Sequence, residues 1–346
     1  MSCIDTQHGS SSSALFAARG AEARRFEDIA EPESPRSLAR EVLALGARHT
    51  LFAAGDYVVL VAQRQHIPLV MNEIGRLREH SFRAVGEGTG KARDIDVYDD
   101  WYLQLFVWHR AGQQVLGAYR LCMTDVVRQR HGDAGLYTRS LFTYDVGFLD
   151  ELGPAVEMGR SFVRPELQGA GRVLALLWRG IAHLLAARPR YRTLFGPVSV
   201  SSVYTEASRE LIATQLCSGE YRHPLFGRVQ PMRPYRAAER EAPGLDVRAL
   251  SRKICQLEPD QKGLPILVKE YVKLGGQFLA FSVDPDFQDA MDGFVVVNLD
   301  RTSAKLLALY MGQENYERFR AWQRPSSRPT ARAPRASLYV GSGTLE

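Results

Sequence analysis

The sequence predicts a mixed α/β fold, and three observations lead to that prediction. Two β-rich runs, 102–109 and 114–122, flank a short Gly-containing segment and predict an antiparallel hairpin. A strand–helix–strand alternation follows over 156–200. Two more strand candidates come late, at 277–283 and 293–299. Together they predict a central mixed sheet flanked by helices, with an extra C-terminal portion.

The first half of the chain supplies its elements in a clear order. Residues 57–62 (YVVLVA) form an unbroken apolar run of strand length, which predicts a buried strand. Residues 68–82 place apolar side chains at helical spacing among charged ones, which predicts an amphipathic helix. The hairpin follows, and 156–163 is the next strand candidate.

The second half repeats this alternation. Residues 173–185 carry apolar side chains at spacings of three and four, which predicts a helix packed on the core. Residues 193–200 are a strand candidate. A helix is expected over 205–216 with Thr205 as its N-cap, and another over 264–274.

Composition narrows the classes of protein. The 346 residues include Lys+Arg 44 and Asp+Glu 39, a net charge of +5, with 45% hydrophobic residues, which excludes wholesale disorder, collagen and coiled coil. Four scattered cysteines without a CxxC pair predict neither a disulfide scaffold nor a metal site. No apolar run approaches the ~18 residues of a membrane span, and the Ser-rich N-terminus lacks an apolar signal core, so a cytoplasmic protein is expected.

One domain is expected between two irregular ends. Residues 1–40 are interpreted as a disordered leader, 45–315 as the domain, and 219–262 within it as a polar excursion or lid. The Arg- and Pro-rich stretch 316–346 is interpreted as a basic disordered tail. Contact of the tail with anionic membrane or an acidic carrier protein, or simple solvation, stays open. Nucleic acid is not an expected partner, because aromatic residues are not interleaved with the arginines.

Residues 157–178 (EMGRSFVRPELQGAGRVLALLW) carry the most informative pattern. A strand ends at Val163, and Gly169 and Gly171 open the following helix. A Gly-rich loop that opens a helix presents free backbone N–H groups to an anion. The glycine spacing fits neither GxGxxG nor GxxxxGK[ST], so both nucleotide-binding interpretations are excluded.

The order V-x-P-x-x-Q-x-x-G, from Val163 to Gly171, resembles the acyl-CoA pyrophosphate loop of the GNAT superfamily of N-acyltransferases. The resemblance implies a GNAT-like fold. It also implies that the phosphopantetheine of an acyl donor is bound by Val163, Gln168, Gly169, Gly171 and Arg172. Val173 stands where the superfamily usually has Gly or Ala, and this difference favours acyl carrier protein over CoA as the donor.

Further motifs extend the resemblance over residues 50–300. They are Arg78-x-x-x-Phe82, Asp94-x-Asp96-x-x-Asp99, Gly117-x-x-Arg120-Leu121 and Glu157-x-x-Arg160-x-Phe162. Their order resembles that of acyl-homoserine-lactone synthases and N-acyl amino acid synthases. The segments GRSFVRPE, LLWRGIA and LFGPVSVSSVY look like a hemolysin-like group that includes the ornithine-lipid N-acyltransferases.

This resemblance implies transfer of a long-chain (3-hydroxy)acyl group from acyl carrier protein or CoA to the α-amine of an amino acid such as ornithine, the first step of an amino-acid-containing membrane lipid. No bound cofactor is implied, and the enzyme could be cytoplasmic or peripheral on the inner membrane face. Direct attack by an amine needs a base and oxyanion donors but no enzyme nucleophile. The catalytic candidates are Glu157 as first base, Asp99 and Arg160. The substrate-binding candidates are Arg78, Phe82, Asp96, Arg120 and Ser199.

Other interpretations stay open. The chain could be an acyl-homoserine-lactone-like signal synthase that uses S-adenosylmethionine, a non-catalytic acyl-carrier or lipid-binding module, or a toxin-like haemolysin. The site residues also have structural interpretations. Glu157 and Arg160 are three apart and would lie on opposite faces of a regular strand, and 94–100 could be a solvated acidic loop.

Overall fold

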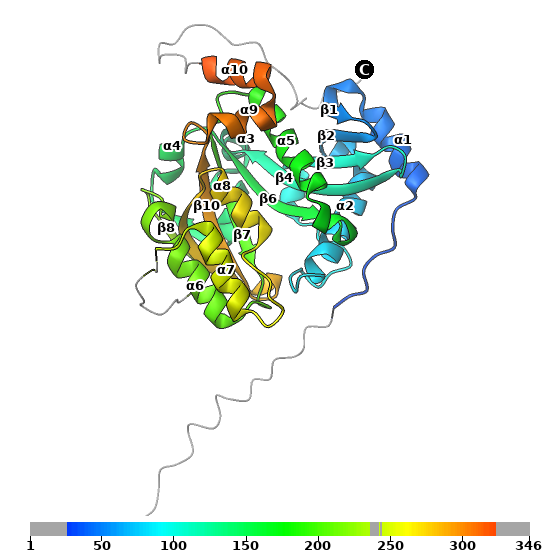
Figure 1. Cartoon of the computed structure of the whole chain (residues 1–346). Helices are drawn as coiled ribbons and strands as arrows, with labels where there is room; N and C mark the ends of the chain where they lie inside the picture. The colour runs from blue at the N-terminus through cyan, green and yellow to red at the C-terminus, as the bar shows by residue number, and fades with distance from the viewer. Residues whose placement is uncertain (1–25, 236–241, 243, 323–346) are drawn as a thin grey trace, which may run out of the picture.

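A computed structural model describes residues 26–235, 242 and 244–322. An eight-stranded sheet runs through it in the order β1-β2-β3-β4-β6-β7-β10-β9 (Figure 1). Neighbouring strands are antiparallel except β6 and β7, which are parallel. The strands are β1 (Thr50–Ala54), β2 (Tyr57–Gln63), β3 (Leu103–His109), β4 (Gln114–Met123), β6 (Ala155–Val163), β7 (Thr193–Val200), β9 (Gln277–Asp284) and β10 (Ala290–Asn298). The predicted mixed sheet is confirmed.

Helices cover this sheet, and a small second sheet pairs β5 (Phe142–Tyr144) with β8 (Val229–Pro231). The helices are α1 (Pro35–Leu45), α2 (Pro68–Arg83), α3 (Thr124–His131), α4 (Phe148–Leu152), α5 (Arg172–Ala186), α6 (Glu206–Leu216), α7 (Val247–Leu257), α8 (Ile266–Lys273), α9 (Ala304–Met311) and α10 (Gln313–Ala321). None of these helices is long and apolar enough to cross a membrane.

The two faces of the sheet bury different helices. Successive side chains of a strand point to opposite faces. In β2, Val58 and Leu60 join a core with α1 and α2, whereas Val59 and Val61 join the larger core that contains α5. Gly180 lets α5 approach the sheet closely, because a Cβ there would lie 2.7 Å from Cγ1 of Val59.

Most elements predicted from periodicity are present, with ends shifted by at most three residues. The predicted helix 173–185 is α5, and the predicted strand 193–200 is β7. Thr205 caps α6 as expected, since its hydroxyl accepts a hydrogen bond from the backbone N–H of Ser208 at 3.3 Å. Regular elements that bury one continuous apolar face are the ones that a sequence pattern reveals.

Three segments that were expected to lie outside the packed core, two as disordered ends and one as an excursion or lid, contain helices. In the predicted leader 1–40, α1 begins at Pro35 and buries Leu38. The predicted excursion 219–262 contains α7, whose Leu250 and Ile254 are part of the main core. Each of these helices buries few side chains and lies in a polar stretch of sequence. The helical spacing of its apolar residues is therefore hard to recognise.

The predicted tail also starts later than expected, since α10 continues to Ala321 and buries Phe319. The rest of the predicted leader and tail, residues 1–25 and 323–346, lies outside the described residues.

Candidate active site

Strands β6 and β7 pair over three residues and then separate. The parallel register runs from Ala155 opposite Thr193 to Glu157 opposite Phe195. Gly196 lies where they part, and a Cβ there would come within 2.0 Å of the Met158 carbonyl oxygen. A cavity opens between the separated strands. Its lining includes Gly159, Arg160 and Ser161 of β6 and Pro197, Val198 and Ser199 of β7.

A β-bulge in β6 brings Arg160 to this cavity. Ala118 of β4 pairs with Phe162 and Arg120 pairs with Gly159, so β6 holds one extra residue. Arg160 has a φ of 48°, in the left-handed region that non-glycine residues rarely adopt. A bulge interrupts the alternation of side chains and re-aims one of them. The expectation that Glu157 and Arg160 act apart, on opposite faces, therefore does not apply.

Glu157 is buried, and its carboxylate is held by several donors. Oε1 accepts the backbone N–H of Thr138 at 2.6 Å, and Oε2 accepts that of Tyr137 at 3.2 Å. The Tyr102 hydroxyl also donates to Oε2, and Cys122 Sγ lies 3.7 Å away. Glu157 does not itself line the cavity. It fastens the 137–138 turn to β6.

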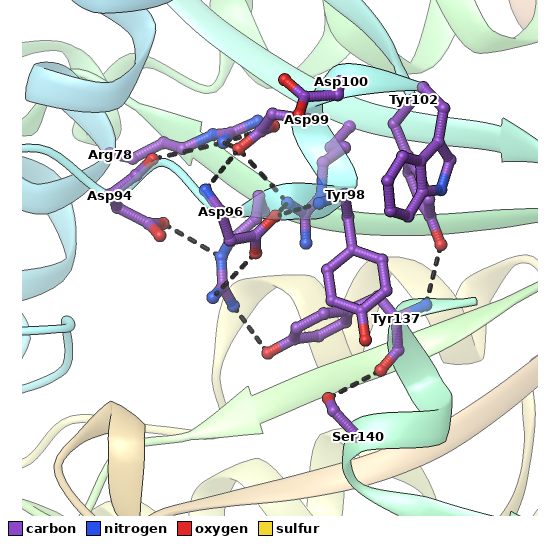
Figure 2. Close-up of polar contacts among 12 residues, drawn as sticks. Arg78, Asp94, Asp96, Tyr98, Asp99, Asp100, Tyr102, Tyr137 and Ser140 are labelled. Carbon is purple, nitrogen blue, oxygen red and sulfur yellow. Dashed lines mark hydrogen bonds and ion pairs between the residues drawn. The ribbon is translucent and has the colours of Figure 1, made fainter. Parts of the chain in front are cut away.

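Arg78 and Asp99 form a fully buried ion pair, with Nη1 2.9 Å from Oδ1 (Figure 2). Asp99 also accepts the Asp96 N–H and Gln104 Nε2, each at 3.0 Å, and Arg120 Nη1 lies 3.4 Å away. Burial works to raise the pKa of Asp99, but the two guanidiniums outweigh it and hold that pKa well below the ordinary value. Asp99 is thus a poor proton acceptor, and Arg78 is covered from any substrate.

Asp96 and Arg120 connect this pair to the cavity. Asp96 caps the short helix after it by accepting the Tyr98 N–H at 2.9 Å, and its Oδ1 lies 2.5 Å from Arg120 Nη1. The Arg120 guanidinium lies 5.0 to 5.7 Å from the ring centres of Tyr98, Tyr102 and Tyr137. These rings and carboxylates fix Arg120 behind the cavity wall rather than in the cavity.

Arg160 is the part of the network that reaches the cavity. Nε lies 3.0 Å from Asp94 Oδ2 and Nη2 lies 3.8 Å from Asp96 Oδ2. Nη1 donates to Tyr137 Oη at 2.8 Å, and the Phe287 ring centre lies 4.9 Å from the guanidinium. Asp94 is 1% exposed and Asp99 is fully buried, so these two aspartates are internal parts of the site and not a solvated loop, whereas Asp100 is exposed.

Phe82 and Ser199, both substrate-binding candidates, also lie at the cavity. Phe82 packs edge-on against Phe287, with ring centres 5.0 Å apart. Ser199 Oγ donates to Glu87 Oε2 at 3.0 Å. Segments far apart in the sequence therefore meet here: the end of α2, the loop after it, β7 and the turn before β10.

Sequence reasoning missed three carboxylates near the cavity, those of Glu87, Asp284 and Asp292. Asp292 lines the cavity from β10, in register with Ser199 of β7. Burial raises the pKa of Glu87 to about 7, against the opposing effects of Ser199 and Arg160. Burial raises the pKa of Asp292 well above its ordinary value, and the like charges of Asp284 and Glu87 add to that rise. The sequence offered a signal for Asp292, which is an isolated acidic residue directly before the predicted apolar strand 293–299.

The predicted donor loop joins β6 to α5. Gln168 Nε2 donates to the Val163 carbonyl oxygen at 3.1 Å, which folds the loop back on the strand end. Gly171 precedes α5 with a φ of 63°, and a Cβ on Gly169 or Gly171 would meet nothing within 4 Å. Open backbone at a helix N-terminus is suited to an anion.

The first two residues of α5 differ in surroundings. Arg172 is exposed, and its guanidinium lies 4.3 Å from the centre of the Tyr57 ring. Val173 is buried, with Cγ1 3.1 Å from the position of a Cβ on Gly117. The side chain that departs from the GNAT pattern thus packs against β4.

Comparison with known proteins agrees with the predicted fold and resemblance. Residues 77–179 match the family described as acetyltransferase (GNAT) domain. The predicted resemblance to GNAT N-acyltransferases is confirmed.

The chain is 41% identical over 198 residues to the glycine N(alpha)-acyltransferase of Phocaeicola vulgatus, covering 54% of this chain and 60% of that one. It is 25% identical over 279 residues to the L-ornithine N(alpha)-acyltransferase of Brucella abortus, covering 78% and 91%. The chain thus spans about 60% of the length of the first relative. A solved CoA-dependent acyl-homoserine lactone synthase shares 12% identity and a TM-score of 0.35, over 75% of this chain and 97% of that chain.

Proposed function

We propose that this chain is an N-acyltransferase that moves an acyl group from a thioester to the α-amine of an amino acid. The observation that supports this most is the cavity between the separated β6 and β7, with the donor loop following β6 directly. Beyond Glu157, the edge of β6 that faces β7 is open for pairing. The amide groups of a pantetheine arm can hydrogen-bond to such an edge while its phosphate binds at the loop.

In this proposal the site residues divide into groups that face the acceptor and groups that hold them. Arg160 binds the carboxylate of the acceptor, because a guanidinium matches a carboxylate in a bidentate fashion. Phe82 and Ser199 complete the wall. Behind that wall, the residues with positioning roles are Asp94, Asp96, Asp99, Arg78, Arg120 and Glu157.

The names of the relatives support an amino acid acceptor, with ornithine and glycine the first to test. The proposed donor is a long-chain (3-hydroxy)acyl group on acyl carrier protein or CoA, since both carry the phosphate that the loop suits. An amino acid with a long acyl chain partitions into a bilayer. That property supports a role in making a membrane lipid and a working position at the inner face of the membrane.

The test is release of free thiol from 3-hydroxyacyl carrier protein and from acyl-CoA, with a panel of amino acids and with S-adenosylmethionine. We expect release that requires one amino acid, together with the N-acyl product by mass spectrometry. A requirement for S-adenosylmethionine would instead indicate a signal synthase. No release with any pair of donor and amine would overturn the proposal and favour a binding module.

A further inference from the structure

Asp292 differs from the other carboxylates of the site because it lines the cavity without a partner. Its residue is 6% exposed. Among the described residues, no hydrogen bond or ion pair engages its oxygens. Glu157, in contrast, accepts from two backbone N–H groups and a hydroxyl. An unpaired buried carboxylate is costly to the fold, so a group of this kind points to a ligand.

The neighbours of Asp292 make the cavity locally negative. Ser199, its register partner on β7, donates to Glu87 instead. Asp284 on the adjacent β9 accepts one backbone N–H, at 2.9 Å from its Oδ1, and when ionised it is a like charge near Asp292. The nearby positive group is Arg160, which already contacts two aspartates behind the wall. A surplus of negative charge in a narrow site attracts a cation.

We infer that Asp292 receives the ammonium group of the acceptor and takes up the proton that the amine must lose before it attacks. This inference rests on the proposed function and assigns its missing base. Arg160 lines the same cavity, so a zwitterionic amino acid finds a carboxylate for its ammonium group and a guanidinium for its carboxylate.

The step balances in atoms and charge. One ammonium proton moves to an Oδ of Asp292, and the neutral nitrogen attacks the thioester carbonyl carbon. The new C–N bond forms, the C–S bond breaks, and the thiolate takes the second nitrogen proton as it leaves. Asp292 then returns its proton to solvent.

The surroundings of Asp292 suit such a base. Its carboxyl is buried and faces the carboxyls of Glu87 and Asp284 and the guanidinium of Arg160. The phenols of Tyr119, Tyr137 and Tyr271 line the same cavity. Burial and the two like charges raise the pKa of Asp292 towards the range in which a carboxylate accepts a proton effectively.

The first experiment compares wild type with Asp292→Asn in the thiol-release assay. We expect kcat to fall by roughly 100-fold or more, the KM of the acyl donor to stay unchanged, and the acid limb of the pH profile to disappear. An Asp292→Asn enzyme within twofold of wild type, with the same pH profile, would overturn the inference. Wild type without activity would instead overturn the proposed function.

A second measurement is independent of catalysis. Titration calorimetry measures the Kd of the amino acid in the absence of donor. We expect wild type to bind it, and Asp292→Asn to bind it with a Kd at least tenfold higher. Equal binding by the two proteins would contradict the placement of the ammonium group. This result is informative even if no thiol is released.

A third measurement separates a base from a structural residue. An α-aminooxy acid presents a nitrogen that is largely unprotonated at neutral pH, because the adjacent oxygen withdraws electron density, so it needs no base. We expect Asp292→Asn to recover most of its lost rate with this acceptor and to melt at or above the wild-type temperature, because an unpaired buried charge has been removed. Glu314→Gln, on exposed α10, is the control. Equal loss with both acceptors, or failure of Asp292→Asn to fold, would count against the inference.

Discussion

Arg160 Nη1 donates a hydrogen bond to Tyr137 Oη at 2.8 Å, while the backbone N–H of that same tyrosine donates to Glu157. Two residues of one strand, three apart in sequence, thus hold Tyr137 by its two ends. The bulge at Arg160 makes this geometry attainable. Through Tyr137, the carboxylate of Glu157 is connected to Arg160 in the cavity wall while it remains buried.

Glu157→Gln tests this coupling. An amide replaces one acceptor oxygen with a donor next to backbone N–H groups, so we expect stability to fall by about 1–3 kcal/mol. We also expect the rate to fall with the acid limb of the pH profile retained. Thermal melts and pH–rate profiles measure both quantities. Unchanged stability with a lost acid limb would make Glu157 the base instead of Asp292.

Arg160→Lys tests carboxylate recognition. A lysine replaces a planar fork by a point charge, so we expect the KM of the amino acid to rise roughly tenfold or more. The KM of the methyl ester, which lacks the carboxylate, should change little. Steady-state kinetics with the two acceptors provide the comparison, and the donor KM is the internal control. An unaltered preference for the free acid over the ester would contradict this role.

Glu87→Gln tests the charge around the cavity. Burial raises the pKa of Glu87 from 4.5 to about 7 in the folded protein. Folded Glu87 therefore binds its proton more tightly than unfolded Glu87. Below the pKa of the unfolded state, Glu87 is protonated in both states and does not change the free energy of unfolding. As pH rises from that pKa to the pKa of the folded state, Glu87 lowers the free energy of unfolding by up to roughly 3 kcal/mol.

Glu87→Gln should remove this pH dependence. We expect its melting temperature to exceed that of wild type at about pH 7.5 and to approach it near about pH 4.5. Glu314→Gln, on the exposed surface, should follow the wild-type curve. Parallel curves for Glu87→Gln and wild type would mean that Glu87 is already ionised in the fold.

Gly196→Ala tests the separation of the two central strands. The added methyl would lie 2.0 Å from the Met158 carbonyl oxygen, so β6 and β7 must move apart. We expect a loss of about 1–3 kcal/mol in stability, together with a marked loss of activity. Gly169→Ala is a matched control for stability alone, because its Cβ meets nothing within 4 Å but the residue belongs to the donor loop. Calorimetry on both variants decides, and equal melting temperatures would refute the close approach.

Arg172→Glu tests the donor. The exposed guanidinium beside the donor loop is a candidate contact for an acidic carrier protein or a phosphate. We expect the KM of acyl carrier protein to rise and to become less sensitive to salt. An acyl-pantetheine without phosphate should react as before. An equal effect on both donors would show that Arg172 supports the fold of the loop and not its ligand.

Much of the fold could be predicted from the sequence because its elements are locally determined. The apolar spacing of α5 and the Thr205 cap are properties of neighbouring residues, and the structure has both. The short helices α1 and α7 could not be recognised, because each buries only two side chains within a polar stretch.

The candidate site was predictable only where it follows a motif. The arginines and aspartates behind the wall were singled out together and lie together. Glu87 and Asp292 were not, because they are about 200 residues apart and belong to no common motif. The bulge at Arg160 was also invisible, since a positive φ on an arginine depends on tertiary contacts rather than on residue type.

The wall that carries Asp292 is built by the β9–β10 hairpin, which lies beyond the GNAT-matched residues 77–179 and forms one edge of the sheet. Under the proposed function, the loop that binds the thioester and Arg160, which binds the acceptor carboxylate, lie inside residues 77–179, whereas Asp292, which receives the ammonium group, lies outside them. The sequence of an edge hairpin can change in evolution, or the whole hairpin can be replaced, while the donor loop is preserved. One fold could in this way give rise to enzymes that acylate different amino acids with the same fatty acyl chain.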